Sequence, residues 1–546
     1  MKRSLLSLLA LFLALSMLLC SFVACKEEPP QTDDPDTNDD TTPPAEDAKP
    51  YTHSETYYTE AQHNTIKAAL ESRDSAFGSL DGALTPAVTM NIETITDCSI
   101  TSISIPVQKT LAADSRGKFT FTLSVVDSTL NGMRSAPVSG ITLELDADEY
   151  ELAENSFIYR YVTVDLSSSP LVLGADQTLA LGAPEDTLIA AFVKTTASDI
   201  ATYLKKECGE PGMFQHGASA ELIYDRDLLC FDFTMQRTYA SEAEYNAYVA
   251  EKKAEEDAFN AKVEALKAAG YKGKKISIVG DSISTFAGVS NDTSINTTLG
   301  SNSSHNSANG NVCDWTMTYW GRLITALEME LCVANCWSGS KVYGTGGDSD
   351  DSLLERADQL HRDGGTPNDP SDDTAPDIII IYMGINDMLN SPRASHLDGA
   401  DVDKTAAMNT WKTNVIDPKY ATYKTNKTIT PGTTYANWQE AYAMGLMLMQ
   451  ETYPDAEIWL MSLVESNAHS SGKKTHIDHA NLYIRAMADL FDVKVIDQQE
   501  NGYITKQNSY LYGHDEHELI TAIHPNLKGH ALMARLIVDE FYKNLP

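Results

Sequence analysis

A serine directly after a short apolar run is the first candidate for chemistry in this chain. The run Lys274–Val279 alternates polar and β-branched residues and ends in Gly280-Asp281-Ser282. It predicts the first strand of an α/β sheet with Ser282 at its C-terminal end, where open α/β sheets bind ligands. The position two after the serine is Ser284, so this is not a Gly-x-Ser-x-Gly nucleophile elbow. Taken alone, the turn also fits a simple helix cap.

Three further polar blocks stand beside predicted strands or helices. Asn335-Cys336-Trp337-Ser338-Gly339-Ser340 follows an apolar run, Gly384-Ile385-Asn386-Asp387 follows another, and Ile523-His524-Pro525-Asn526 precedes the last predicted helix. A serine hydroxyl becomes a good nucleophile when a base takes its proton, and a histidine is the usual base. The blocks therefore predict a nucleophilic site if the fold brings them together.

The elements that must position these blocks alternate between strands and helices over residues 271–546. Five strands with helical crossovers predict a flavodoxin-like, doubly wound parallel sheet, in which the loops after successive strands meet at one edge. The predicted strands are Ile276–Gly280, Leu331–Cys336, Asp377–Met383, Glu457–Leu463 and Val493–Asp497. The predicted helices lie near Trp315–Met329, Ser352–Leu360, Tyr435–Tyr453, Thr475–Phe491 and Leu527–Tyr542.

In order and context, the four blocks resemble the signature blocks of the SGNH (GDSL-type) hydrolase family. The resemblance covers roughly 271–546 and implies a serine hydrolase acting on carboxylic esters. It implies Ser282 as nucleophile, His524 as base, and three oxyanion donors: the backbone N–H groups of Ser282 and Gly339 and the side-chain amide of Asn386. Gly339 is expected because a side chain there would keep the backbone away from the oxygen.

The chain departs from the family pattern at the acid. The pattern has an aspartate three residues before the histidine, where this chain has Thr521. Asp515, Glu516 or Glu518 can replace it, a Ser-His dyad held by a backbone carbonyl is equally open, and so is a slow or inactive enzyme. His514 and His517 lack a third ligand in a fixed motif, so we predict neither a metal nor a cofactor.

The N-terminus predicts export. Met1-Lys2-Arg3 precedes an apolar run that reaches Val23, as in a secretory signal peptide. The end of that run, Phe22-Val23-Ala24-Cys25, resembles a bacterial lipobox, which implies a signal peptide over 1–24 and lipidation at Cys25. An uncleaved membrane anchor is the alternative. Residues 25–50 are acidic, rich in proline and almost without apolar residues, which predicts a disordered linker.

Residues 51–240 predict a separate all-β sandwich domain. After a short helical pattern at Tyr58–Ser72, period-2 alternation begins, as in Phe119–Val125. Similar runs recur between Gly, Pro and Asp turn signals, without intervening helices. Residues 241–270 predict a connector helix that starts with the capping box Ser241–Glu244 and stops at Gly270.

Composition limits the partners. The formal net charge is −36, from 41 basic and 77 acidic side chains, which excludes a nucleic-acid partner because phosphate binding needs a basic surface. Cysteines after Cys25 show no metal spacing, and we assign no disulfide pairing. The segments Thr285–Val312 and Met388–Thr433 are long for connections and predict substrate-facing loops. Five aromatic residues are candidates either for a sugar-binding cleft or for the core: Trp315, Trp320, Trp337, Tyr343 and Trp438.

Together these features predict an exported, membrane-anchored lipoprotein on the cell surface. Its function is expected to be hydrolysis of short acyl esters, foremost acetyl, on extracellular polysaccharide. A deacylase of lipid esters or of peptidoglycan is the alternative within the same chemistry. A surface carbohydrate-binding protein with a decayed hydrolase domain is the alternative of another class, motivated by Thr521.

Overall fold

The structure is a computed structural model, and the residues that it describes begin at residue 50. The described residues are 50–71, 77–80, 88–90, 98–107, 118–127, 138–146, 160–174, 177–182, 189–193, 228–229, 232–286, 289, 314–344, 352–364, 373–390, 405–464, 471–505, 513–514, 524–525 and 527–546. The predictions for the signal peptide, for Cys25 and for the linker lie outside these residues. Within the described part, no helix is both long enough and apolar enough to cross a membrane.

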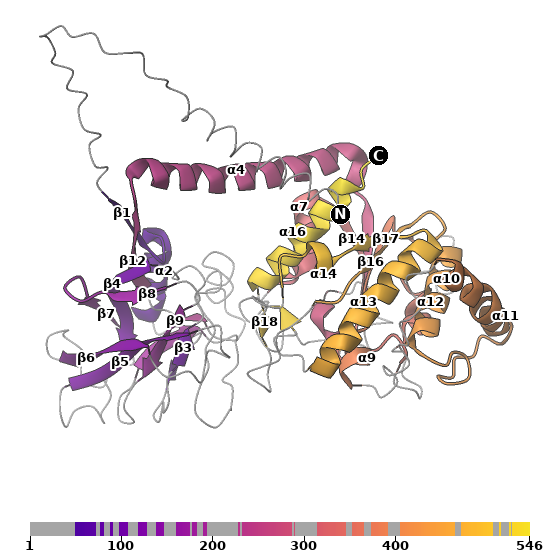
Figure 1. Ribbon diagram of the computed structural model, residues 1–546, viewed down its shortest axis with the longest axis horizontal. Coiled ribbons are helices and arrows are strands. Elements are labelled where there is room, and N and C mark those ends of the chain that lie inside the picture. Colours follow the sequence, from indigo (N-terminus) through magenta and orange to yellow (C-terminus); the bar gives the residue numbers. More distant parts are fainter. Residues whose placement is uncertain are drawn as a thin grey trace, which may run out of the picture. The chain divides into compact units, whose positions relative to one another are not determined.

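In the described residues, the N-terminal part consists of antiparallel sheets and one helix, α2 (Glu60–Glu71) (Figure 1). One sheet has the order β1-β12-β4-β7 with β8 also paired to β4, a second has the order β3-β9-β5-β6, and a third β11-β10-β2. The all-β character is therefore as predicted, whereas a sandwich of these sheets stays a prediction. The strands are β1 (Tyr51–Thr56), β2 (Phe77–Leu80), β3 (Val88–Met90), β4 (Cys98–Val107), β5 (Lys118–Asp127), β6 (Ser139–Asp146), β7 (Arg160–Asp165), β8 (Leu171–Leu173), β9 (Gln177–Gly182), β10 (Ile189–Val193), β11 (Leu228–Leu229) and β12 (Asp232–Tyr239).

Helix α4 (Glu242–Leu266) follows β12 at the predicted place. The Ser241 side chain accepts a hydrogen bond from the backbone N–H of Glu244 at 3.2 Å, as a capping box requires. The return bond differs from the prediction, because the Glu244 carboxylate accepts from the N–H of Ala240 rather than from that of Ser241. Gly270, with φ +96°, leaves the helical backbone conformation inside the π-helical turn Lys267–Tyr271 that extends α4, as expected of a glycine near a helix end.

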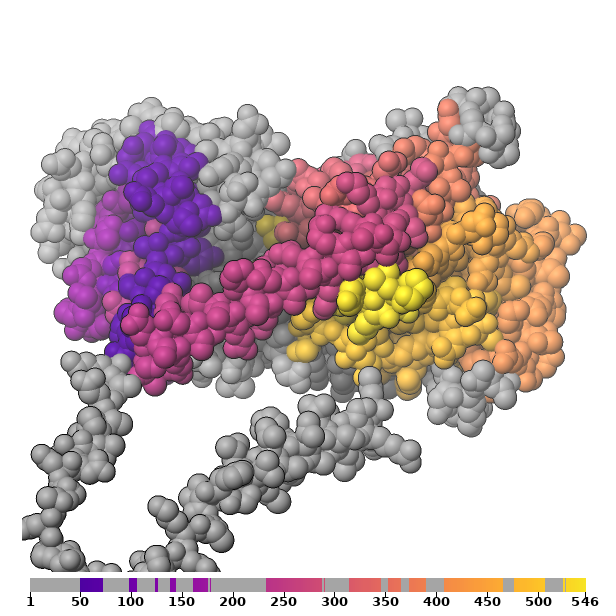
Figure 2. All heavy atoms as spheres, turned by 90° about the horizontal axis from the view of Figure 1, so that it is seen from above, coloured from indigo at the N-terminus to yellow at the C-terminus, as the bar shows by residue number. Residues whose placement is uncertain are grey.

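The C-terminal half of α4 packs against the last helix, α16 (Leu527–Lys543). Lys262 pairs with Asp539 at 2.7 Å, and the Arg535 guanidinium lies over the Phe259 ring. Val263 and Leu266 are buried in the core of the C-terminal domain. Figure 2 shows α4 (magenta) beside the C-terminal residues (yellow). This half of the predicted connector thus forms part of the C-terminal core.

The C-terminal domain is built on a five-stranded parallel sheet with the order β14-β13-β15-β16-β17. Numbered along the chain, this is the order 2-1-3-4-5, so the predicted flavodoxin-like topology is present. The strands are β13 (Lys275–Gly280), β14 (Glu330–Cys336), β15 (Ile378–Tyr382), β16 (Glu457–Met461) and β17 (Lys494–Ile496). All pair in parallel, as helical crossovers dictate.

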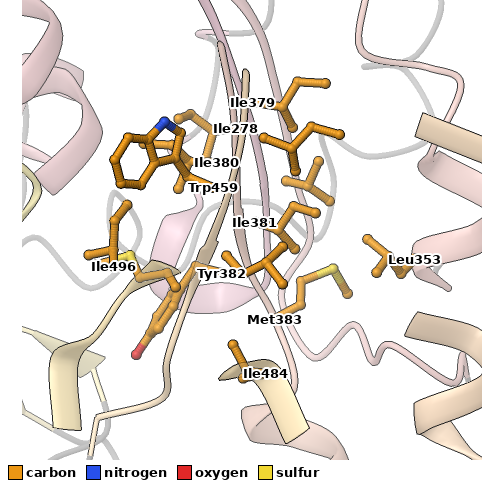
Figure 3. Packing of buried hydrophobic residues seen from close by; sticks show 14 of the residues in the cluster. Ile278, Leu353, Ile379, Ile380, Ile381, Tyr382, Met383, Trp459, Ile484 and Ile496 are labelled. Atoms are coloured by element: carbon orange, nitrogen blue, oxygen red, sulfur yellow. The ribbon is translucent and has the colours of Figure 1, made fainter. Parts of the chain in front are cut away.

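Both faces of this sheet are covered, which explains why β15 is apolar at every position. In Figure 3, Ile380 and Tyr382 point to one side of β15 together with Trp459, whereas Ile379 and Ile381 point to the side of Leu353. The helices around the sheet are α7 (Tyr319–Leu327), α8 (Leu353–Arg356), α9 (Ile385–Asn390), α12 (Trp438–Thr452), α13 (Ser471–Phe491), α14 (Gln498–Asn501) and α16.

The segment 388–433 differs from the predicted loop. It contains α10 (Thr405–Trp411), a π-helical turn (Lys412–Ile416) and α11 (Asp417–Asn426). The Tyr420 hydroxyl donates to Glu451 on α12 at 2.9 Å, and Lys424 pairs with the same carboxylate at 2.7 Å. A buried tyrosine and an ion pair thus hold part of this insertion on the domain as a packed helical layer.

Candidate active site

The carboxyl ends of the three neighbouring strands β14, β13 and β15 meet at one edge of the sheet. Gly280 at the end of β13 is in register with Cys336 on one side and with Tyr382 on the other. The loops that follow therefore begin side by side, and these loops carry three of the four sequence blocks. The fourth block reaches the same edge through His524.

Ser282 and His524 form a hydrogen-bonded pair although 242 residues separate them. The Nε2 atom of His524 lies 2.8 Å from the Oγ atom of Ser282. Ser282 begins a short 3₁₀ turn, η4 (Ser282–Ser284), and is buried with 6% exposure. His524 lies on β19 (His524–Pro525), just before α16, and its backbone pairs with His514 of β18 (Gly513–His514). This distance allows Nε2 to take the serine proton.

Several hydrogen bonds fix the turn that presents Ser282. The Asp281 carboxylate accepts the Ile283 N–H at 3.1 Å and so caps η4. The hydroxyl groups of Ser284 and Tyr319 lie 2.8 Å apart. A Cβ atom on Gly280 would lie 2.3 Å from the Cβ and Oγ atoms of Ser284, so only glycine allows this close return of the chain.

The two other candidate oxyanion residues come from the neighbouring loops. Gly339 has φ +76°, which favours glycine, but a Cβ atom there would meet no atom within 4 Å. The left-handed backbone is thus a reason for glycine at this position, and the expected close approach of a substrate oxygen stays a prediction. The Nδ2 atom of Asn386 donates to the Ser340 carbonyl at 3.0 Å. An amide nitrogen carries two N–H bonds, so this contact leaves Asn386 one further donor.

Asp387 has a role that the sequence reasoning missed. Its carboxylate is buried and accepts two backbone N–H groups of the loop after β14, from Val342 at 2.8 Å and from Tyr343 at 3.0 Å. It thereby ties the loop after β14 to the loop after β15. Its place next to Asn386 in the third block is the signal that could have drawn attention to it.

Asp281 is an ionisable residue that directly precedes the candidate nucleophile in the chain. Its side chain is fully buried, and among the described residues its Oδ2 atom has no hydrogen-bond partner. Burial raises the pKa of this carboxyl group to about 7, although the Ile283 N–H and the positive charge of Arg356 act in the opposite direction. The cap of η4 is thus a carboxyl group that titrates near neutral pH.

His530 on α16 is a second histidine close to the site. Its Nδ1 atom accepts the backbone N–H of Tyr319 at 3.2 Å, and its ring stacks on the Tyr319 ring. Burial, then the charges of Arg322 and His524, lower its pKa to about 3. His530 is therefore neutral and packs as a core residue.

Other predicted features resolve into core residues or lie outside the described part. Trp320, Trp438 and Tyr343 are buried, whereas Trp315 and Trp337 are partly exposed. Cys98, Cys332 and Cys336 are buried, and Cys332 and Cys336 are free thiols. Outside the described residues lie the acid candidates Asp515, Glu516, Glu518 and Thr521, most of the loop 285–312, and the cysteines Cys208, Cys230 and Cys313. The described residues hold no group of histidine, cysteine or carboxylate side chains that fits a metal ion.

Comparison with known families decides the identity of the domain. Residues 274–416 match the family model described as GDSL-like Lipase/Acylhydrolase. The domain belongs to this family. The match contains Ser282, Gly339 and Asn386, and it confirms the resemblance drawn from the blocks. The GDSL-like domain is accordingly an ester hydrolase. No curated protein matches the chain.

Several solved structures resemble the chain at low identity. A GDSL-like lipase from Bacteroides ovatus is 21% identical, with 50% of this chain and 100% of that chain covered and a TM-score of 0.29. A family two carbohydrate esterase from Cellvibrio japonicus is 12% identical, with 90% and 98% covered and a TM-score of 0.29. A phospholipase A1 from Streptomyces albidoflavus is 13% identical, with 49% and 99% covered and a TM-score of 0.28. At such TM-scores these likenesses do not bear on the substrate of the GDSL-like domain.

The Asp281 carboxyl should make stability depend on pH in a way that Asp281→Asn removes. Between pH 3.8, its ordinary pKa, and about 7, the folded protein keeps a proton that the unfolded chain releases. The free energy of unfolding then falls as pH rises, by at most about 1.4 kcal/mol per pH unit. The amide oxygen of the introduced asparagine can still accept the Ile283 N–H. The Tm of the variant minus that of the wild type should therefore increase from pH 5 to pH 7.5.

Asp377→Asn is the matched control, because this exposed carboxylate also accepts a backbone N–H, from Lys275 at 2.7 Å. It should follow the wild-type profile. If Asp281→Asn and the wild type run parallel across this range, the buried carboxyl does not titrate there.

Proposed function

We propose that the chain is a serine esterase that removes short acyl groups, foremost acetyl, from extracellular polysaccharide. The observation that supports the serine mechanism is the 2.8 Å contact between His524 Nε2 and Ser282 Oγ. It lies at the sheet edge where the loops with Gly339 and Asn386 also begin. A hydroxyl paired with an imidazole, beside donors fixed in advance, is the arrangement that acyl transfer needs.

In this mechanism His524 takes the Ser282 proton as Oγ attacks the ester carbonyl. The carbonyl oxygen becomes an oxyanion, and the proposed donors to it are the backbone N–H groups of Ser282 and Gly339 and the amide of Asn386. The Ser282 N–H is the first of a 3₁₀ turn and so lacks a partner within that turn. His524 then protonates the leaving alcohol, and a water molecule, activated by the same base, releases the acid from Ser282.

The choice of an acetylated polysaccharide rests on features outside the site. They are the predicted signal peptide at residues 1–24 and the additional antiparallel-sheet part at 51–240. We propose that the lipid at Cys25 holds the enzyme at the cell surface. Lipid esters and peptidoglycan are the competing substrates, and their turnover would replace the polysaccharide proposal without affecting the serine mechanism.

Ser282→Ala should abolish turnover of p-nitrophenyl acetate and of acetylated xylan, with little change in Tm, because a single hydroxyl group at a strand end contributes little to stability. Labelling by a serine-reactive phosphonate should disappear at the same time. Ser462→Ala is the control: this buried serine after β16 bonds Asp497 at 3.0 Å and should keep both activities. If the Ser282→Ala variant turns over these esters within twofold of the wild-type rate, Ser282 is not the nucleophile.

The acid partner of His524 can be identified by three substitutions. If Thr521 occupies the usual aspartate position and no other carboxylate serves, Thr521→Asp should raise kcat/KM. If Asp515 or Glu518 serves, Thr521→Asp should bring no gain, whereas Asp515→Asn or Glu518→Gln should lower kcat heavily, on the scale of the roughly 10⁴-fold loss seen for a protease triad aspartate. Any gain from Thr521→Asp should be smaller than that factor. Unchanged kcat/KM in all three variants would mean that a backbone carbonyl orients His524.

Cys25→Ala should move the protein out of the membrane fraction of a bacterial host. The reason is that the proposed permanent anchor is the lipid, which removal of the thiol prevents. Fractionation followed by N-terminal sequencing gives the measurement. A cleaved variant that still partitions with the membrane would contradict the lipid anchor.

A further inference from the structure

Arg356 is a fully buried cation at the same sheet edge, and the mechanism above does not use it. It is the last residue of α8, and its side chain is among the largest in the protein with no exposed surface. Its Nη1 atom donates to the carbonyl oxygens of Gly280 and Asn335, each at 3.1 Å. Its Nη2 atom lies 3.2 Å from Ser340 Oγ and 2.7 Å from Met383 Sδ.

These four partners belong to the three segments that carry the proposed oxyanion donors. Gly280 ends β13 and stands two residues before Ser282. Asn335 is the second-last residue of β14, and Ser340 follows Gly339 directly. Met383 is the first residue after β15, three residues before Asn386. The guanidinium thus contacts every segment from which an oxyanion donor is expected.

Ser340 couples the guanidinium to two of the donors. Its hydroxyl receives the Arg356 contact and lies 3.4 Å from the Gly280 carbonyl, and its own carbonyl accepts the Asn386 amide at 3.0 Å. A shift of Ser340 would therefore displace the amide of Asn386 and the backbone of Gly339 together. A planar fork with fixed donor directions suits this task better than a single ammonium group.

Helix α8, which carries Arg356, is itself held in place by hydrogen bonds and close packing. A complete capping box starts the helix, with the Ser352 N–H on the Glu355 carboxylate at 2.8 Å and the Glu355 N–H on Ser352 Oγ at 3.2 Å. A Cβ atom on Gly445 of α12 would lie only 3.0 Å from Leu353 Cγ, so the two helices touch closely. Burying a cation costs stability unless its hydrogen bonds are met. Since an apolar residue could fill the same space between sheet and helix, the hydrogen bonds of Arg356 are the feature that needs a role.

We propose that Arg356 is a positioning residue for the oxyanion site, whose guanidinium fixes the relative placement of the strand ends that carry Ser282, Gly339 and Asn386. The inference rests on the proposed serine esterase function. It concerns the geometry of the donors in the transition state, so substrate binding in the ground state should depend on Arg356 much less.

The test is Arg356→Lys, which keeps the positive charge and loses the fork. With p-nitrophenyl acetate we expect kcat to fall by about tenfold or more, below the roughly 10²–10³-fold loss of a whole donor, with KM within about twofold. The inhibition constant of a trifluoromethyl ketone, which mimics the tetrahedral intermediate, should rise by the same factor as kcat/KM falls. Active-site titration corrects for unfolded protein.

Arg362→Lys is the matched control. Arg362 also donates to a β14 carbonyl, that of Leu331, but near the opposite end of the strand. The Arg362→Lys variant should have a lower Tm than the wild type and an unchanged kcat. If Arg356→Lys does not fold, Ser340→Ala removes the hydroxyl that receives the guanidinium and should give the same pattern at smaller size.

The outcomes separate this inference from the proposed function. If the wild type cleaves esters and binds the ketone, but Arg356→Lys or its substitute Ser340→Ala retains kcat/KM within twofold, the positioning role is wrong and the esterase stands. A loss of kcat matched by an equal rise of KM would also overturn it. If the wild type neither turns over an ester nor binds the ketone, the proposed function itself fails.

Discussion

The site depends on one geometric constraint, the parallel pairing of β13 with a neighbour on each side. Because the strands run the same way, Gly280, Cys336 and Tyr382 end at the same level, and the chain must leave the sheet there three times within a small space. Every such exit exposes backbone donors that regular pairing no longer satisfies. The Asp387 carboxylate accepts two of these donors, the N–H groups of Val342 and Tyr343, and in the proposed mechanism others bind the substrate oxyanion.

Buried charge at this edge is arranged to hold loops. Asp387 binds two N–H groups of the loop after β14, whereas Arg356 binds carbonyl groups at the ends of β13 and β14. Both charges also act on Asp281. Burial raises the pKa of its carboxyl group most, the positive charge of Arg356 lowers it, and the negative charge of Asp387 raises it. At this edge a carboxylate thus accepts backbone N–H groups, and a guanidinium donates to backbone carbonyl groups. Such a frame limits how far either loop can move.

Sequence reasoning predicted most of the C-terminal fold because its signals are local and strong. The unbroken apolar run Ile378–Ile381 fits a strand covered on both faces, and the glycine, serine and asparagine of the blocks mark strand ends. β1 was missed because Tyr51–Thr56 is largely polar and becomes a strand by pairing with β12. The helices α10 and α11 were missed because their sequence is polar and their stability comes from contacts such as Tyr420 with Glu451.

The site shows the same division. The blocks named Ser282, His524, Gly339 and Asn386, which the structure gathers or aligns at one edge, but they did not show the left-handed backbone of Gly339. Arg356 has no signal in the sequence: it ends a four-residue helix and looks like any solvated arginine. Its role follows from burial and from carbonyl groups that are remote along the chain, and neither can be read from residue types.

The packing of α4 on α16 determines where the chain can be truncated to give an isolated C-terminal domain. The family match starts at residue 274, which suggests cutting the chain just before β13 to isolate the hydrolase. Such a fragment would lack Val263 and Leu266, whose side chains fill its core, and Lys262, whose partner Asp539 would remain. It would expose an apolar strip on α7 and α16 to water and invite self-association. The smallest piece that keeps its own surface intact begins within α4, ahead of Phe259.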